Sequence, residues 1–191
     1  PFLDWDFLEA AESSGCAQPD TGWTPRHMLA HDATGKLVGA APLYLKTHSR
    51  GEFVFDHSWA DALHRAGGRY YPKLLCAVPF TPVTGRRLLA TGPNAPAIRQ
   101  AMAGAIVEVA QQWRVSSAHF NFLEEQEWQA LGLQELLLRE DQQFHWLNRG
   151  YGSFEDFLGA LSSRKRKMLR RERREAPALP MTSRPSYARG A

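Results

Sequence analysis

The sequence predicts a mixed α/β fold, and three patterns carry that prediction. Residues 97–114 repeat apolar side chains at helical spacing, which is typical of an amphipathic helix packed on a core. Residues 117–123 alternate apolar and polar side chains instead, as a half-buried strand does. Two further strand-like runs, 26–31 and 36–48, are joined by a short glycine-containing turn and predict a β-hairpin.

The other expected elements follow from the same periods and from turn and capping residues. Ser58 with Asp61, and Ser153 with Asp156, are spaced as capping boxes that open helices. Pro42 lies inside a strand-like run and predicts a bulge or an edge position. The complete set adds helices at 2–14, 58–67, 124–131 and 153–175, and strands at 52–55, 74–79, 86–91, 134–139 and 142–147.

Charge is distributed unevenly along the 191 residues, and this suggests the domain organisation. Residues 1–161 hold 13 Lys and Arg against 18 Asp and Glu, whereas residues 162–191 hold 10 against 2. We therefore expect a globular domain at 1–161, a basic linker helix at 162–176 and a disordered tail at 177–191. Two cysteines and no apolar run of membrane-spanning length favour a cytoplasmic protein.

The basic helix is the strongest compositional signal. Guanidinium and ammonium groups on nearly every face suit the phosphates of a nucleotide cofactor, a pyrophosphate lipid or an RNA backbone. A solvated helix packed only by its leucines and methionine is the alternative, and sequence-specific RNA binding is disfavoured because no aromatic residues interleave with the charges. The candidate cofactor-binding residues are Arg164, Lys165, Arg166, Lys167, Arg170 and Arg171.

Aromatic and basic residues crowd the stretch 52–91 around one short apolar strand, as functional loops on a rigid scaffold do. Some of them can line a pocket, and two adjacent arginines after a glycine turn can clamp an anion, although surface loops and opposed strand faces would also explain them. The candidate substrate-binding residues are Trp59, Tyr70, Tyr71, Lys73, Arg86 and Arg87.

Three residues are candidates for acid–base catalysis. Asp56 ends a strand-like run, and Asp61 is also explained as a helix cap. His145 alternates with aromatic residues and serves either as a base or as a hydrogen-bonded structural histidine. Cys76 lies in an apolar run and is expected to be a core residue. The histidines and cysteines lack metal-ligand spacing, and nucleotide-binding glycine motifs and a nucleophile elbow are absent.

Several stretches, taken in order, resemble the bacterial peptidoglycan biosynthesis/recognition family of GNAT-type N-acyltransferases, which is similar to the Fem aminoacyl transferases. They are PFLDWDFLEA (1–10), GAAPLYLK (39–46), VFD (54–56), WAD (59–61), YYPKLL (70–75), VPFTPVTG (78–85), QFHW (143–146) and SSRKRK (162–167). His57 stands where the family usually has an aromatic residue, so we expect the local pocket to differ. The resemblance covers residues 1–175 and corresponds to the first of two such halves.

The resemblance implies a GNAT-like mixed sheet flanked by helices, and transfer of an acyl or aminoacyl group to an amine. The implied donor is an acyl-coenzyme A or an aminoacyl-tRNA, and the implied acceptor is a small molecule or a cell-wall precursor. A second half or a second copy of the chain is the expected partner. The alternatives are a non-catalytic module that recognises a phosphate-bearing ligand and an RNA-associated protein.

Overall fold

The structure, a computed structural model, describes residues 2–176. The chain divides into two compact units, Pro1–Arg139 and Glu140–Ala191, and each is described by itself. The predicted domain boundary at 161–162 falls inside the second unit, and the predicted tail at 177–191 lies outside the described residues.

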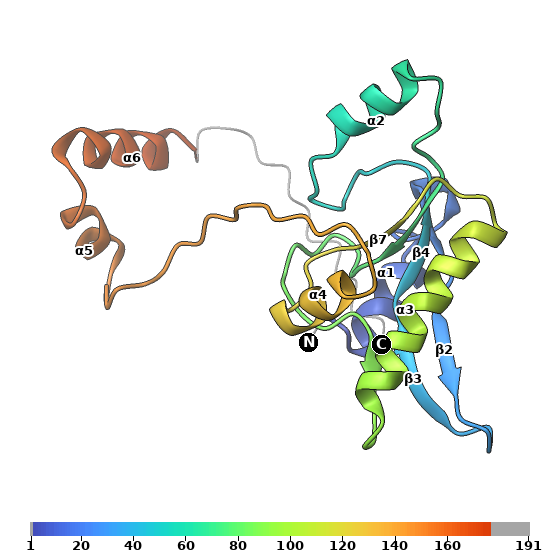
Figure 1. Cartoon of the computed structure of the whole chain (residues 1–191). Helices are drawn as coiled ribbons and strands as arrows, with labels where there is room; N and C mark the ends of the chain where they lie inside the picture. Colours follow the sequence, from blue (N-terminus) through green and yellow to red (C-terminus); the bar gives the residue numbers. More distant parts are fainter. Residues whose placement is uncertain (1, 177–191) are drawn as a thin grey trace, which may run out of the picture. The chain divides into compact units, whose positions relative to one another are not determined.

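The first unit holds two β-sheets flanked by helices (Figure 1). All strand pairs are antiparallel except β5 and β7, which are parallel. The predicted mixed α/β fold is therefore confirmed, and the arrangement is consistent with a GNAT-like fold. One sheet has the order β1 (Trp23–Pro25), β4 (Leu43–Lys46), β5 (Lys73–Cys76), β7 (Ala118–Phe120), and the other has the order β2 (Met28–His31), β3 (Leu37–Ala41), β6 (Leu89–Ala90).

Apolar side chains cover both faces of the four-stranded sheet. Successive residues of a strand point to opposite faces, so Leu74 joins a core that includes Ile106 of α3 (Ala95–Gln112), whereas Leu75 joins a cluster with Trp23 and Tyr44. Ala11, from α1 (Trp5–Ser13), packs against this second cluster. The long amphipathic helix predicted from periodicity is thus confirmed, and the sheet is held between helices.

The ladder is interrupted between β5 and β6 by residues 77–88. Two residues lie between Ala40 and Leu43, whereas twelve lie between their pairing partners Leu89 and Cys76. The intervening residues form an excursion that leaves the four-stranded sheet after β5 and enters the three-stranded sheet at β6. Pro42 lies where the opposing strand passes from one sheet to the other, between β3 and β4, so it marks a junction and not a bulge within one strand.

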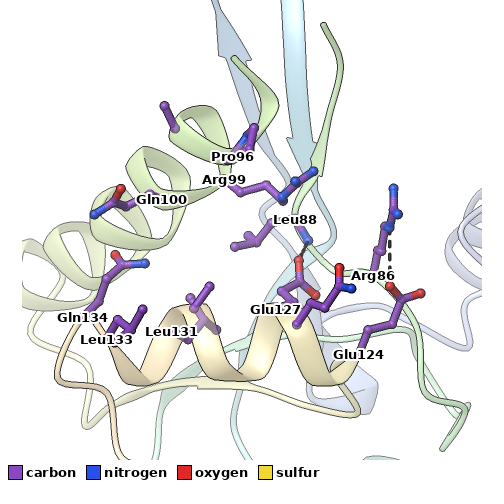
Figure 2. Close-up of a pocket in the computed structure, with 13 residues that line it drawn as sticks. Arg86, Leu88, Pro96, Arg99, Gln100, Glu124, Glu127, Leu131, Leu133 and Gln134 are labelled. Carbon is purple, nitrogen blue, oxygen red and sulfur yellow. Dashed lines mark hydrogen bonds and ion pairs between the residues drawn. The ribbon is translucent and has the colours of Figure 1, made fainter. Parts of the chain in front are cut away.

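Two buried side chains hold this excursion in place. The guanidinium of Arg87 donates to the carbonyl oxygens of Val83 and Arg86, at 2.6 and 3.1 Å. The carboxylate of Glu127, from α4 (Glu125–Gly132), accepts from the backbone N–H groups of Arg87 and Leu88 at 2.9 and 2.8 Å (Figure 2). A buried charge is stable only when paired or hydrogen-bonded, and these backbone contacts meet that need except at Arg87 Nε, which is buried without a hydrogen-bond partner within residues 2–176.

The predicted strand at 52–55 and the predicted cap at Ser58 are both wrong. Residues 52–55 form no strand, and α2 (His57–Arg65) begins one residue before Ser58. Asp56 occupies the N-cap position but makes no side-chain capping bond. Its carboxylate is engaged elsewhere, as described below, and this explains why capping geometry does not set the start of the helix.

The predicted strands at 134–139 and 142–147 are also wrong, because neither segment is paired in the structure. Alternation describes which way side chains point but does not supply a partner strand. Several apolar side chains of these segments are accordingly exposed, Leu137 by 97% and Phe144 by 90%.

The second unit contains two helices in place of the single helix predicted at 153–175. They are α5 (Phe154–Gly159) and α6 (Ser163–Glu175). Ser153 caps α5, since its hydroxyl accepts from the N–H of Asp156 at 3.1 Å. The break between the helices is explained by Arg166. Its guanidinium donates hydrogen bonds to the carbonyl oxygens of Leu158, Gly159 and Leu161, at the end of α5 and just beyond it.

Candidate functional site

Two lysines stand directly opposite each other in the centre of the four-stranded sheet. Lys46 on β4 and Lys73 on β5 are register partners, and both side chains are wholly buried. Like charges in this position oppose folding, and burial adds a large desolvation cost. The site can form only if counter-charges are built beside them.

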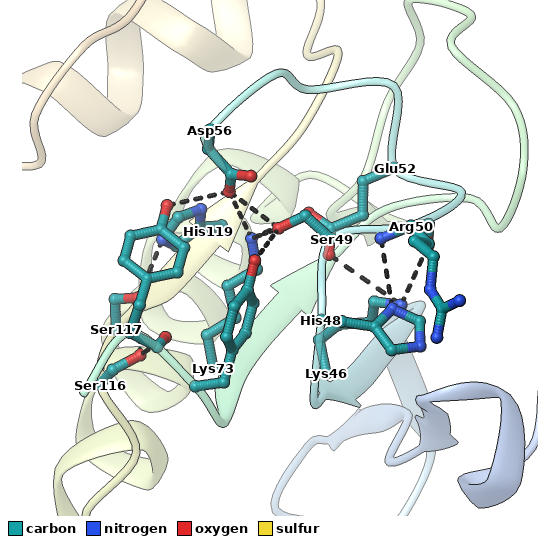
Figure 3. Close-up of polar contacts among 12 residues, drawn as sticks. Lys46, His48, Ser49, Arg50, Glu52, Asp56, Lys73, Ser116, Ser117 and His119 are labelled. Atoms are coloured by element: carbon teal, nitrogen blue, oxygen red, sulfur yellow. Dashed lines mark hydrogen bonds and ion pairs between the residues drawn. The ribbon is translucent and has the colours of Figure 1, made fainter. Parts of the chain in front are cut away.

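The connection between β4 and α2 supplies these counter-charges. Glu52 lies between the two lysines, with Oε2 2.9 Å from Lys73 Nζ and Oε1 4.0 Å from Lys46 Nζ. Asp56 places Oδ2 2.7 Å from Lys73 Nζ. Both carboxylates are buried. The two lysines and the two acids therefore form a compact group of two positive and two negative charges (Figure 3).

Three hydroxyl groups complete the network. Ser49 Oγ donates to Asp56 Oδ2 at 2.9 Å and accepts from Lys73 Nζ at 2.9 Å. Since its single proton is used, the 2.7 Å contact with Tyr71 requires the phenol to donate to Ser49. Tyr70 also donates to Asp56 Oδ2, at 2.9 Å. We call this set the buried charge cluster: Lys46, Ser49, Glu52, Asp56, Tyr70, Tyr71 and Lys73.

Burial and pairing act against each other on the acids. For Asp56, burial acts to raise the pKa, but the hydrogen bonds from Lys73, Ser49 and Tyr70 outweigh it and bring the pKa below its usual value. For Glu52, burial raises the pKa in spite of both lysines. Asp56 is therefore ionised at neutral pH, and Glu52 is the more easily protonated of the two acids.

Lys46 occupies an unusual environment for an amine. Burial lowers its pKa to about 7, an effect that Glu52 only partly offsets. Its Nζ lies 3.6 Å from the centre of the Trp23 ring and donates to the carbonyl of Arg50 at 3.4 Å. The ring face favours the charged form, so this lysine is held near the balance between its two protonation states.

His119 on β7 borders the cluster through Tyr70, with ring centroids 6.0 Å apart and perpendicular. Burial, followed by the charge of Lys73, lowers the pKa of His119 to about 4. The imidazole is thus neutral at physiological pH, and Nε2 contacts the hydroxyl of Ser117 at 2.8 Å. Burial and Asp56 together raise the pKa of Tyr70, which stays a hydrogen-bond donor.

Both Glu52 oxygens and Asp56 Oδ1 are buried without a hydrogen bond within residues 2–176, but the Glu52 oxygens lie within 4.0 Å of a lysine Nζ. Asp56 Oδ1 is buried and lacks a hydrogen-bond partner within residues 2–176, while Oδ2 receives three donors. A buried carboxylate oxygen without a donor is costly. The geometry can therefore accommodate one further N–H or O–H donor at this atom, supplied from outside the cluster.

The structure brings together four of the residues predicted as site residues: Asp56, Tyr70, Tyr71 and Lys73. It adds others that sequence reasoning missed, namely Lys46, Ser49, Glu52 and His119. A signal existed for Lys46, because it follows Tyr44 at strand spacing and so shares a face with a buried aromatic residue. The position of Glu52 depends on a loop conformation that no periodicity reveals.

The remaining predicted residues of the first unit lie outside this network. Asp61 is exposed on α2, and Trp59 is 54% exposed with the Arg139 guanidinium 5.0 Å from its ring centre. Arg86 is exposed and pairs with Glu124 at 3.4 Å, whereas Arg87 is buried inside the excursion. The two adjacent arginines thus have different environments, and only Arg86 is open to a ligand.

The predicted cofactor-binding residues lie on α6 in the second unit. Arg166 is bound to the carbonyls at the end of α5, Arg170 pairs with Glu155, and Arg171 with Glu175 at 3.7 Å. Arg164, Lys165 and Lys167 are exposed and form no ion pair within the described part of the chain. His145 belongs to the same unit, is exposed, and contacts Gln143 at 3.2 Å.

Two further structural findings concern metal ions and membrane spans. Among the described residues, no group of three or more His, Cys, Asp or Glu side chains is placed to hold a metal ion. None of the helices between residues 2 and 176 combines the length and the apolar character that a membrane span requires.

Comparison with known proteins gives one match. A family model named FemAB-like and described as peptidoglycan biosynthesis/recognition matches residues 1–185. No curated protein and no solved structure matches the chain.

Proposed function

The chain belongs to the FemAB-like family of peptidoglycan biosynthesis/recognition, and from this premise we propose that it transfers an acyl or aminoacyl group to an amine. The acceptor would be a cell-wall precursor or a smaller amine. The donor would be an acyl-coenzyme A or an aminoacyl-tRNA, used in the cytoplasm.

The observation that carries the proposal is the free oxygen of Asp56. An acceptor amine brings N–H donors and, when protonated, a positive charge, and Asp56 Oδ1 offers a buried acceptor with a lowered pKa. The other oxygen is fixed by Ser49, Tyr70 and Lys73 and cannot turn away. The carboxylate is thus preorganised for an amine.

In the proposed reaction the amine nitrogen attacks the acyl carbonyl carbon and forms the amide C–N bond. The C–S or C–O bond to the donor breaks, and its electron pair leaves with the thiolate or the ribose oxygen. The amine loses one proton. Asp56 is too acidic to keep it, so it serves to orient the amine, and Lys46, with a pKa of about 7, is the better matched proton acceptor.

Contacts connect these two ends of the cluster. Asp56 meets Lys73 at 2.7 Å, Lys73 meets Glu52 at 2.9 Å, and Glu52 lies 4.0 Å from Lys46. The proton returns from the cluster to the leaving group or to solvent. Because Asp56 Oδ1 is buried, admission of the amine requires a local movement that uncovers this oxygen.

On the donor side, the exposed residues Arg164, Lys165 and Lys167 are the part of the predicted phosphate cradle that is available. Arg166 and Arg170 already have partners within the second unit. The proposal also includes a partner, either a second half or a second copy of the chain, that would complete the donor site.

The test is turnover with labelled acetyl-coenzyme A, and separately with charged tRNA, against a panel of amines. Asp56→Asn keeps the shape of the side chain and removes the charge that orients the amine, so we expect a loss of about 10²-fold in rate. Asp6→Asn, an exposed carboxylate on α1, is the matched control and is expected to leave the rate unchanged. Asp61→Asn tests the other predicted base.

A non-catalytic recognition module is the second candidate, favoured by one observation. The four charged side chains of the cluster are all buried and face one another, as in a purely structural network. Saturable ligand binding without turnover, unaffected by Asp56→Asn, would support this function and contradict transfer. Removal of residues 162–191 should leave such binding intact, whereas it would abolish RNA binding through the basic helix.

A further inference from the structure

A second candidate site lies between α3 and α4, beside residues 86–88 at the end of the excursion. It is a cavity of about 440 Å³, within the size range of small-molecule sites. Its apolar wall is formed by Leu88, Pro96, Ala97, Ala130 and Leu131, and Figure 2 shows side chains from both helices and from the excursion turned toward it.

Most charges around this cavity are already compensated. Arg86 pairs with Glu124, and the carboxylate of Glu127 is occupied by two backbone N–H groups. Arg99 is different. Its guanidinium lines the cavity, is partly buried, and makes no hydrogen bond or ion pair with any residue between 2 and 176.

Amide side chains surround the same space. Gln100, Gln126 and Gln134 line the cavity, and none of their side-chain amides is hydrogen-bonded within the described chain. Each offers both donors and an acceptor. The wall therefore presents one unpaired cation, three amides and an apolar surface.

We propose that this cavity binds a small monoanion with amide groups, namely a short peptide end or an N-acylated amino acid, whose carboxylate pairs with Arg99. A planar guanidinium matches a carboxylate in a bidentate manner. The glutamine amides match the peptide groups, and the apolar wall accepts small aliphatic side chains. The inference is independent of the transfer reaction, because it concerns a different set of residues and is tested by binding alone.

The charge balance of the wall argues against a polyphosphate ligand. Only one cation is unpaired, and Glu124 and Glu127 lie in the same lining. A single carboxylate neutralises Arg99, whereas a pyrophosphate would bring additional negative charge against two carboxylates. The composition thus selects a monoanion.

The experiment is titration of the ¹⁵N-labelled chain with N-acetyl-alanyl-alanine, followed by amide chemical shifts. From the ligand efficiency typical of small molecules, a Kd of about 1 mM is expected. Shifts should be confined to residues that line the cavity, such as Leu88, Gln100 and Leu131. The same dipeptide with a C-terminal amide should bind about 10- to 100-fold more weakly, because it lacks the charge.

Variants locate the contact. Arg99→Gln should lower the affinity for the acid to that for the amide, while Arg65→Gln, an exposed arginine on α2, should change neither. Ala130→Phe should fill the cavity and weaken both probes. Equal affinity of acid and amide for the unaltered protein, shifts centred outside the cavity, or displacement of the acid by equimolar inorganic pyrophosphate would each overturn the proposal.

Discussion

Positive charge is concentrated in two parts of the protein, and it is buried and paired in one but exposed in the other. In the first unit Lys46 and Lys73 are buried side by side, and each is brought close to a carboxylate. In the second unit α6 carries its arginines and lysines in solvent, and several of them have no partner within residues 2–176. Desolvation separates the two cases, since a buried charge must be paired and an exposed one need not be.

The comparison shows which cations belong to the fold and which are available to a ligand. Pairing within the buried charge cluster is a condition of folding, and Asp56 Oδ1 is its carboxylate oxygen with neither a hydrogen bond nor an ion pair within the described residues. On α6 Arg166 is bound to three backbone carbonyls, and Arg170 and Arg171 form exposed ion pairs with Glu155 and Glu175. The number of charges is therefore a poor guide to function, and their contacts are a better one.

The largest contrast is expected on removing one positively charged side chain from each place. Lys73→Met leaves Glu52 and Asp56 buried without their shared partner, so we expect the free energy of unfolding to fall by about 3–5 kcal/mol. Arg164→Met on α6 removes an exposed charge and should change it by less than about 0.5 kcal/mol. Urea denaturation followed by circular dichroism measures both. Similar values for the two variants would contradict the view that Lys73 is structurally required.

How much of this was visible in the sequence depends on whether the information is local. The helix at 95–112 and the strand at 118–120 follow from periodicity, which is a local property. Tyr70, Tyr71 and Lys73 were found because they crowd one stretch. The juxtaposition of Lys46 and Lys73 depends on strand register, which joins residues far apart in the chain.

The incorrect predictions of two strands and of one continuous helix also arise because local patterns do not specify contacts with other parts of the chain. The unpaired segments at 134–139 and 142–147 alternate as strands do, but pairing requires a partner that alternation does not specify. The break between α5 and α6 depends on a long side chain reaching back to carbonyl groups, and helix propensity alone favours continuity there.

A pH titration sharpens the comparison further. In the unfolded chain a lysine titrates near its ordinary value of 10.5, whereas burial lowers the pKa of Lys46 to about 7 in the folded protein. Between these values the unfolded state binds more protons, so stability should rise with pH, by at most about 1.4 kcal/mol per unit. The window to examine is pH 7 to 8.5, because burial raises the pKa of Cys76 and acts in the opposite direction at higher pH.

Lys46→Met provides the control for this effect. The variant lacks the titrating amine and keeps a similar apolar stem over Trp23. Its stability should be nearly flat over the same window, measured by urea denaturation at fixed ionic strength. An equal slope in both proteins would assign the proton uptake to another group.

A smaller effect is expected from Arg166, the arginine of α6 that binds backbone carbonyls. Arg166→Ala frees the carbonyls of Leu158, Gly159 and Leu161, and hydrogen bonds from a charged donor contribute about 1–3 kcal/mol. The loss should be local, so amide hydrogen exchange should accelerate in α5 and α6 and not in β5. Arg164→Ala, in the same helix, should leave exchange unchanged.

The smallest expected effects concern the exposed cations, and they appear in binding, not in folding. If Arg164, Lys165 and Lys167 contact phosphates, the logarithm of the affinity for a short polyphosphate falls linearly with the logarithm of salt concentration. Each substitution by Ala should then reduce the magnitude of that slope by about 1. Arg166→Ala should leave the slope nearly unchanged, because its guanidinium is occupied by carbonyl groups. A reduction by Arg166→Ala equal to the others would mean that α6 binds anions through its total charge, and the distinction between committed and available cations would then not extend to this helix.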